Sequence, residues 1–159
     1  MDMNTTTIPP MIRYICGLQD KVLSVSENGE VIAKYDYHAN GQLAGVVKNG
    51  KTEEFFWDGL ALIKRGGTSY VNEPAMTGGN PILAVDDKSE KVLFNDMLGS
   101  TMGSVSGKDY KAVDMTLFGE SKTEDEEVFF TGKPEVDGLG YAFAFRNYRS
   151  SLGKWQTAD

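Results

Sequence analysis

The fold is decided by the stretch VIAKYDYHANGQLAGVVKNGKTEEFFWDGL, residues 31–60. Its first eight residues alternate between largely apolar and polar side chains, which is the period of an extended strand with one buried face. Tyr35 and Tyr37 fall on the apolar face, whereas Asp36 and His38 fall on the other. This stretch therefore predicts a half-buried strand that leads directly into a turn.

Asn-Gly dipeptides occur three times in and just before this stretch, at residues 28–29, 40–41 and 49–50. Asn-Gly is the strongest short-range hairpin signal, because both central residues of a type I′ turn need positive φ. Glycine is also abundant, at 18 of 159 residues, and it is dispersed rather than gathered in a low-complexity segment. This distribution predicts many tight turns between short strands.

Short apolar stretches separated by turn residues continue in both directions from this segment. We expect strands at residues 22–26, 31–37, 43–47, 53–57, 60–64, 69–71, 82–85, 92–94, 113–118, 128–130 and 141–148. No window carries a comparable helical stripe, and the β-branched residues and charged turn of residues 80–98 favour a hairpin there. The predicted fold class is all-β, with antiparallel hairpin repeats forming a twisted or coiled sheet and little helix.

The length and charge of the chain argue against two classes of function, nucleic-acid binding and membrane spanning. A chain of 159 residues predicts one domain, which we place at residues 12–159 after a polar lead-in at residues 1–11. The net charge of −7 opposes binding to nucleic acid, which requires a positive field. No apolar run approaches the ~18 residues that span a bilayer, and the amino terminus carries no signal-peptide pattern. We therefore expect neither nucleic-acid binding nor a membrane span.

An aromatic–acidic–turn–glycine unit recurs along the chain, at residues 35–43 and 56–60 and more weakly at 94–99 and 117–120. The first copy, YDYHANGQL, resembles the YD repeat of the RHS (rearrangement hot spot) family. The ordered segment at residues 130–159, from FTGK through DGLGY and FRNY to LGKW, resembles the RHS repeat-associated core that ends such arrays. The resemblance spans residues 20–159, nearly the whole chain.

The family motifs fall on a defined set of positions in this sequence. These positions are Asp36, Gly41, Asp58, Gly99, Gly119, Gly132, Arg146, Tyr148, Gly153 and Asp159. Two departures stand out: residues 149–150 are Arg-Ser where the family usually carries Asp-Pro, and the sequence stops at 159 where the family pattern continues. The resemblance implies a non-catalytic scaffold, the terminal part of a bacterial, toxin-associated RHS/YD-repeat array.

By the same resemblance, such arrays coil a long sheet into a shell around a carboxy-terminal effector, or form secreted or cell-surface proteins. One strand-turn-strand unit cannot bury its aromatic face alone, so the units must stack. We expect free sheet edges to pair with other YD-repeat units of a parent chain or with a second copy. The effector is a further expected partner.

The sequence offers little for catalysis. His38 and Cys16 are the single residues of their kinds, and we expect an exposed histidine beside a turn and a buried structural thiol. The acidic runs at residues 86–87 and 125–127 are consecutive, so their side chains alternate between faces and do not converge. We therefore expect no enzyme activity, no metal and no cofactor. One alternative is a remnant of an aspartyl-type self-cleaving core, of which Asp159 alone can be placed.

Aromatic residues offer the other alternative, a carbohydrate- or surface-binding β module. Tyr35, Tyr37, Trp57 and Trp155 would present their rings to a sugar or a partner in such a module. Alternation favours placing most of these aromatic side chains in the core, because each buries about 150–250 Å² of surface. Burial of the rings would therefore argue against the binding module.

Overall fold

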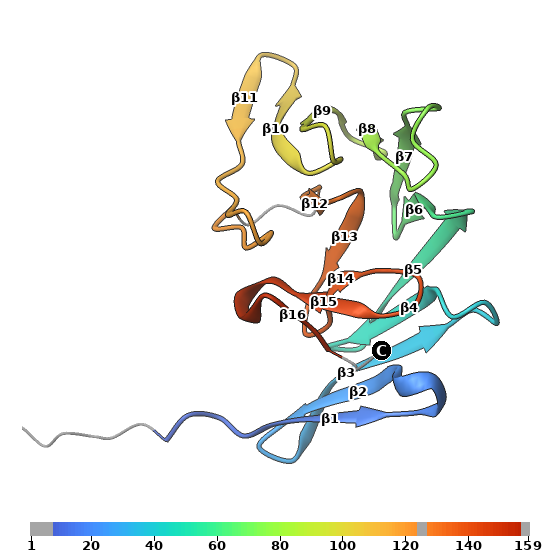
Figure 1. Cartoon of the computed structure of the whole chain (residues 1–159), viewed down its shortest axis with the longest axis vertical. Coiled ribbons are helices and arrows are strands. Elements are labelled where there is room, and N and C mark those ends of the chain that lie inside the picture. The colour runs from blue at the N-terminus through green and yellow to red at the C-terminus, as the bar shows by residue number, and fades with distance from the viewer. Residues whose placement is uncertain (1–7, 124–126, 157–159) are drawn as a thin grey trace, which may run out of the picture.

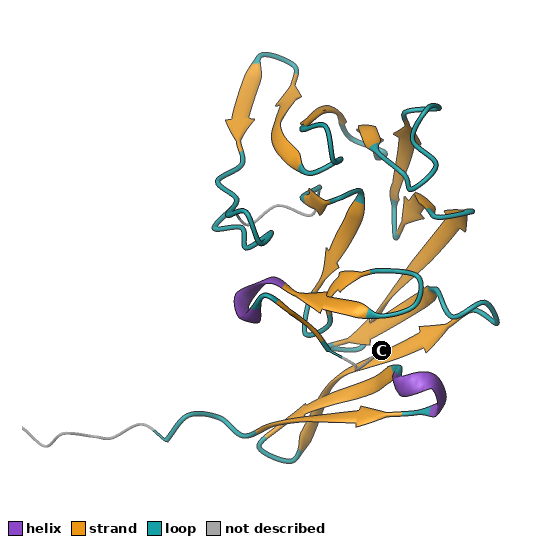
Figure 2. Cartoon of the chain, in the orientation of Figure 1, coloured by secondary structure: helices purple, strands orange, loops and turns teal. Residues whose placement is uncertain are grey.

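The computed structural model describes residues 8–123 and 127–156, which form two antiparallel sheets (Figures 1 and 2). The large sheet contains β1 (Ile12–Cys16), β2 (Val22–Glu27), β3 (Glu30–Tyr37), β4 (Leu43–Lys48), β5 (Lys51–Asp58), β6 (Ala61–Arg65), β7 (Thr68–Asn72), β8 (Pro81–Val85), β9 (Glu90–Asn95), β10 (Thr101–Ser106) and β11 (Asp109–Ala112). The small sheet contains β12 (Phe129–Phe130), β13 (Lys133–Val136), β14 (Gly140–Ala142), β15 (Asn147–Arg149) and β16 (Lys154–Trp155). Two single-turn 3₁₀ helices, η1 (Leu18–Asp20) and η2 (Ser150–Leu152), complete the elements. The predicted fold class is confirmed.

Each sheet is a meander in which every strand pairs with its neighbours in the sequence. Two of the three Asn-Gly pairs behave as predicted, because Asn28 and Gly29 have φ of 50° and 89° and Asn49 and Gly50 have φ of 51° and 71°. The third pair differs. Gly41 alone has a positive φ there, and the turn closes through a bond from the His38 backbone N–H to the Gln42 carbonyl.

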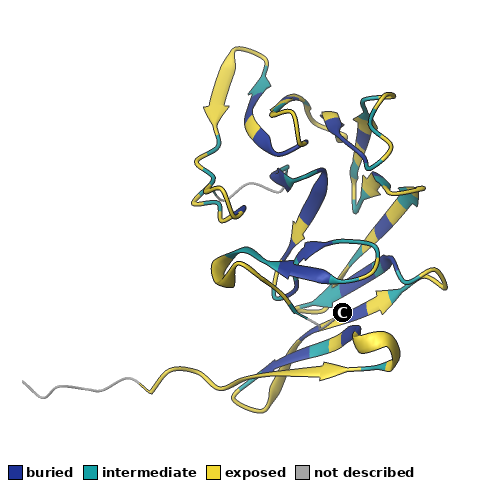
Figure 3. Cartoon of the chain, viewed as in Figure 1, coloured by how far each residue is buried: buried dark blue, intermediate teal, exposed yellow. Residues whose placement is uncertain are grey.

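The large sheet follows a C-shaped course from β1 to β11, and the small sheet lies in its hollow (Figure 1). Buried residues gather where the two sheets face each other (Figure 3). The shared core takes Val22, Val25, Ala33, Tyr35, Leu43, Val46, Phe55, Leu62, Tyr70, Ala84 and Leu93 from the large sheet and Phe129, Val136, Leu139 and Ala142 from the small sheet region. The sheet does not close, so β1 and β11 are its two edges.

Two predicted strands are wrong. Residues 113–118 form no strand, and Met115 makes an isolated bridge to Ser121 instead. The strands of this region are β10 and β11, which the pattern did not indicate. The inward side chains of β10 are Thr101 and Ser104, and Thr101 Oγ1 accepts a hydrogen bond from the Phe129 backbone N–H across the sheets. Because the inward face of β10 is polar, its sequence lacks the apolar–polar alternation by which strands were predicted.

The predicted strand at residues 141–148 is two strands, β14 and β15, joined by a reversal at residues 143–146. Tyr141 is fully buried, but Phe145 is 80% exposed. The reversal is stabilised by aromatic contacts, because the Phe143 ring packs edge-on against Trp155 at 5.0 Å between centroids. The aromatic alternation of this segment therefore does not describe one continuous face.

The predicted exposure of the single cysteine is wrong, whereas that of the single histidine is confirmed. Cys16 is exposed, so the predicted buried thiol is wrong. The reason is its position at the end of the edge strand β1, all five residues of which are exposed. His38 is exposed beside a turn, as predicted. Among the described residues, no helix is long and apolar enough to cross a membrane.

Candidate functional site

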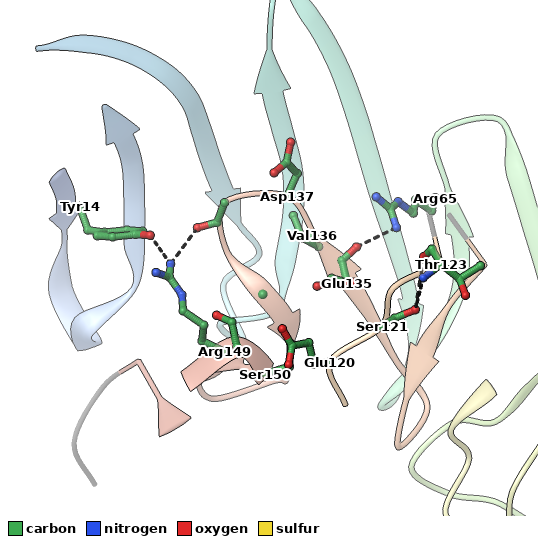
Figure 4. A pocket seen from close by; sticks show the side chains of 13 residues that line it. Tyr14, Arg65, Glu120, Ser121, Thr123, Glu135, Val136, Asp137, Arg149 and Ser150 are labelled. Atoms are coloured by element: carbon green, nitrogen blue, oxygen red, sulfur yellow. Dashed lines mark hydrogen bonds between the residues drawn. The ribbon is translucent and has the colours of Figure 1, made fainter. Parts of the chain in front are cut away.

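A cavity of about 830 Å³ opens between the two sheets (Figure 4). The large sheet contributes Tyr14 from β1 and Arg65 from the end of β6. The small-sheet region contributes residues 135–138 and Gly140 around the β13–β14 turn and residues 149–151 at the end of β15. Glu120, Ser121 and Thr123 complete the wall. The cavity walls therefore contain several of the contacts that attach the small sheet to the large one.

Arg149 bridges the sheets at one end of this cavity. Its Nη2 donates a hydrogen bond to the Tyr14 hydroxyl and a longer one, at 3.4 Å, to the Gly138 carbonyl. The guanidinium carbon also lies 4.7 Å from the centroid of the Tyr14 ring. The half-buried cation is thus stabilised by a ring face and by oxygen dipoles.

Arg65 forms the corresponding bridge at the other end. Its Nε donates to Glu53 Oε1 at 3.0 Å within the large sheet, and its Nη1 donates to the Glu135 carbonyl at 3.0 Å in the small sheet. Burial raises the pKa of the Glu135 carboxyl, and the nearby Arg65 charge opposes that shift. Arg65 therefore connects β5, β6 and β13.

The β13–β14 turn is held against β3 between these two bridges. The Tyr35 hydroxyl donates to the Asp137 carbonyl at 2.8 Å, and Lys48 pairs with the Asp137 carboxylate. Gly138 has φ of 75°, and a Cβ there would lie 2.6 Å from the Tyr35 oxygen. Burial raises the pKa of Tyr35 to about 12. The turn approaches the tyrosine more closely than a side chain at 138 would allow.

Two buried lysines add anchors outside the cavity. Lys133 Nζ in β13 donates to the carbonyls of Leu60 and Gly78 in the large-sheet region, and Lys21 Nζ donates to the Ala144 carbonyl at 3.0 Å. Both residues are less than a tenth exposed. Burial lowers the pKa of each lysine. Backbone carbonyl oxygens solvate each cation, which is why it tolerates the interface.

The docking of β12 and β13 depends on backbone contact. The Gly132 N–H donates to the Gly99 carbonyl at 2.8 Å, and the Thr131 N–H donates to Ser100 Oγ at 3.1 Å. A Cβ on Gly132 would lie 1.9 Å from the Gly79 carbonyl oxygen. Glycine at 132 is therefore required for the two chain segments to meet.

These contacts assign a structural role to the cavity walls. Its arginines and the Tyr14 hydroxyl are used as bridges. The Ser121 hydroxyl donates to the Thr123 carbonyl and accepts from the Thr123 backbone N–H, and the Thr123 hydroxyl accepts from the Asp114 backbone N–H. In the described part of the chain, no three His, Cys, Asp or Glu side chains are grouped to hold a metal ion. The hydrogen bonds of Arg65 and Arg149 to carbonyl and hydroxyl oxygens hold the two sheets together.

The aromatic residues proposed for ligand contact lie in two environments. Tyr35 is 2% exposed, and the Tyr37 hydroxyl and the Trp57 indole N–H donate to the carbonyls of Val22 and Leu43, both at 2.7 Å. These three rings pack in or against the core. Trp155 is 39% exposed and is the member of the set with the most accessible ring.

The family-motif positions lie mainly in turns and at the sheet interface. Gly41, Gly99, Gly119, Gly132 and Gly153 all have positive φ, and the Gly119 carbonyl accepts the Tyr141 hydroxyl at 2.7 Å. Asp36 and Asp58 are exposed strand residues, Tyr148 is buried, and Arg146 lies over the Trp155 ring at 4.1 Å. Asp159 and residues 125–126 lie outside the described residues.

The sequence pattern did not indicate Lys21, Lys133, Tyr14 or Arg149 as interface residues. Their partners are far away in the chain, for example 123 residues from Lys21 to Ala144 and 135 residues from Tyr14 to Arg149. The GKPEV stretch at residues 132–136 carries charges at both Lys133 and Glu135, so it does not mark Lys133 as an interface residue. The carbonyl partners carry no signature in the sequence.

Comparison with solved structures supports a distant RHS-like fold. No protein-family model matches the chain, and no curated protein matches it. Solved structures that share the fold include a crystal structure of TcdB2-TccC3-TEV, with a TM-score of 0.65 and 12% identity, and the Photorhabdus luminescens Tc holotoxin pore with a TccC3 mutation, with a TM-score of 0.66 and 13% identity. Each match covers 93% of this chain and 9% of the other chain, and at this identity it establishes the fold alone.

Proposed function

We propose that the chain is a non-catalytic scaffold segment of a larger, exported, toxin-associated protein of the RHS/YD-repeat type. The single observation that carries the proposal is the open eleven-stranded meander, whose largely apolar edge strand β1 pairs, among the described residues, with β2 alone. The shared fold with Tc toxin chains, of which this chain spans 9%, supports the same interpretation.

The two edges of the large sheet differ in a way that supports this proposal. The edge strand β1 reads IRYIC, and Ile12 and Ile15 are 50% and 56% exposed. The other edge, β11, reads DYKA and carries two charges in four residues. Charged edges oppose strand addition, whereas an apolar edge favours it. The proposed role therefore assigns β1 as the junction with further strands, from a parent chain or from a second copy.

Hydrogen exchange measured by mass spectrometry tests this role. We expect those amides of residues 12–16 that do not bond to β2 to exchange rapidly in the dilute chain and slowly either at high concentration or within the natural parent protein. Ile15→Lys should abolish the slowing, because a charge on the edge opposes pairing. Val71→Lys is the matched control, since Val71 is 51% exposed on the interior strand β7. Rapid exchange of β1 under all these conditions would contradict the proposal.

The self-cleaving and carbohydrate-binding alternatives have their own tests. A chain extended past Asp159 would show two masses instead of one if it cleaved itself, and a single intact mass would reject cleavage. A glycan array compared between the native chain and Trp155→Ala tests the sugar alternative at its most exposed ring. Equal array signals would reject Trp155 as a sugar platform.

A further inference from the structure

A second, smaller cavity of about 280 Å³ lies where the open end of the large sheet meets the last strand of the small sheet. Tyr14, Cys16 and Val22 form its floor on β1 and β2. Its other lining residues come from the carboxy-terminal segment, and they are Arg149, Leu152, Lys154, Trp155 and Gln156. Tyr14 and Arg149 also line the larger cavity, so they form the partition between the two spaces.

The charge of this small cavity is opposite to that of the chain. Its lining contains two cations, Arg149 and Lys154, and no carboxylate, although the chain carries a net charge of −7. Within the described residues, neither cation has a carboxylate partner, and Arg149 instead contacts the Tyr14 hydroxyl and ring. A site lined by unneutralised cations favours an anion.

Val22, Leu152 and Trp155 give the cavity an apolar wall. Val22 is 2% exposed, and Trp155 and Leu152 are 39% and 63% exposed. The Trp155 ring is fixed by edge contacts with Phe143 and Tyr148 at 5.0 and 5.2 Å. A rigid apolar wall of this kind buries a hydrophobic group without much ordering cost.

Gln156 supplies an independent sign of an unfilled hydrogen-bonding role. Its backbone N–H donates to the Asn147 carbonyl at 2.9 Å, which fixes the residue in the wall. Both polar atoms of its side-chain amide are buried and have no hydrogen-bond partner among the described residues. Buried amides are satisfied in the great majority of cases, and the free NH₂ group of this amide can donate to a carboxylate oxygen.

We propose that this cavity binds a carboxylate that carries an apolar side group. The carboxylate contacts Arg149 and Lys154, and the apolar group packs against Trp155, Leu152 and Val22. The volume suits one aromatic or branched side group rather than a larger cofactor. Two sources share this chemistry, a free organic acid and the carboxyl-terminal residue of a peptide, and competition by probes of each kind distinguishes them.

Cys16 provides a site-specific reporter, because it lines the cavity, is exposed and is the chain's single cysteine. The rate of its alkylation by iodoacetamide is measured with 3-phenylpropionate, with acetyl-Gly-Gly-Phe bearing a free carboxyl group, and with the amide of each probe. We expect an acid probe to slow alkylation at about tenfold lower concentration than its amide, since a charge-assisted contact is lost. Slowing by one acid and not the other identifies the source.

Variants place the effect in the cavity. Arg149→Gln and, independently, Leu152→Asp should each weaken protection by about tenfold, the second by repelling the carboxylate at an exposed position. Arg13→Gln is the control, because Arg13 is an exposed arginine on β1 outside the cavity lining. Far-ultraviolet circular dichroism checks that each variant is folded. Absence of protection by both acids, equal protection by acids and amides, or full protection in Leu152→Asp would overturn the proposal.

Discussion

The large and small sheets are held together by different means. In the large sheet, strands of four to eight residues follow one another through tight turns, and alternation places one face in the core. In the small sheet, strands of two to four residues are too short for a comparable apolar face, and their positions depend on bonds to distant carbonyls. Local pattern builds the first sheet, whereas long-range docking builds the second.

The difference assigns the small sheet a specific task. An open sheet that buries one face needs a second layer to cover that face. Here Phe129 packs edge-on against Tyr70 at 5.3 Å, and Val136 and Leu139 join the same core. The small sheet thus covers the hollow of the large sheet and stabilises its curvature, which suits a scaffold segment.

The largest predicted effect comes from the backbone contact at Gly132. Gly132→Ala should lower the free energy of unfolding by about 5 kcal/mol, because its Cβ would overlap the Gly79 carbonyl oxygen. Gly50→Ala is the matched control, with φ of 71° against 75° and open space around its Cβ. It should cost about 1–2 kcal/mol. Equal losses in urea denaturation would show that docking contributes nothing beyond the turn conformation.

The two faces of the large sheet give the next comparison. Phe55→Ala should cost about 3–5 kcal/mol, because Phe55 is fully buried beneath the small sheet. The adjacent Phe56 is 44% exposed on the other face, and Phe56→Ala should cost about 1 kcal/mol or less. Thermal unfolding of both variants measures the difference. Similar losses would contradict the assignment of a single covered face.

Alkaline pH tests the contact between β3 and the small sheet. The folded-state pKa of Tyr35 is raised to about 12, above its ordinary value near 10. The folded state therefore retains the proton longer than the unfolded chain, so the stabilisation is complete below pH 10 and is lost between pH 10 and 12. We expect a loss of about 2–3 kcal/mol over this window. Tyr35→Phe should remove this loss of unfolding free energy between pH 10 and 12. If the free energy of unfolding depends on pH in the variant as it does in the native chain, the predicted contribution of Tyr35 is wrong.

The smallest effect should come from the exposed ion pair. Asp137→Asn removes the pair with Lys48, whose partners are 42% and 72% exposed at their side chains. Surface pairs contribute about 0–1 kcal/mol, so we expect a change below about 0.5 kcal/mol in urea denaturation. The Asp137 carbonyl that accepts Tyr35 remains in this variant. A loss above about 2 kcal/mol would show that surface charge, rather than burial, attaches the turn.

Local signals in the sequence predict much of the large sheet. The turns at residues 28–29 and 49–50 and the strands on either side follow from Asn-Gly chemistry and alternation. Strand β10 escaped prediction because Thr101 and Ser104 face inward, and Thr101 bonds to the small sheet. Residues 141–148 were misassigned because aromatic alternation cannot reveal the reversal after Ala142.

The candidate sites depend on contacts that the sequence does not display. Gly132 belongs to a family-motif position, but the physical reason for glycine there is the Gly79 carbonyl, which lies 53 residues earlier in the chain. Lys133 bonds to backbone carbonyls, which every residue has, and Arg149 packs on a tyrosine ring, which any tyrosine could supply. The residue types alone therefore do not identify the partners. Trp155 was predicted to contact a ligand only because it is a tryptophan. Its ring is accessible because it lies on the short edge strand β16.

We conclude that the docked small sheet stabilises the curved large sheet. This claim can be measured by hydrogen exchange and mass spectrometry in Gly132→Ala, with Gly50→Ala as the reference. We predict that β5, β7 and β9, which carry buried Phe55, Tyr70 and Leu93, lose protection together with β12–β15. Loss of protection confined to β12–β15, with the large sheet as protected as in Gly50→Ala, would contradict the claim.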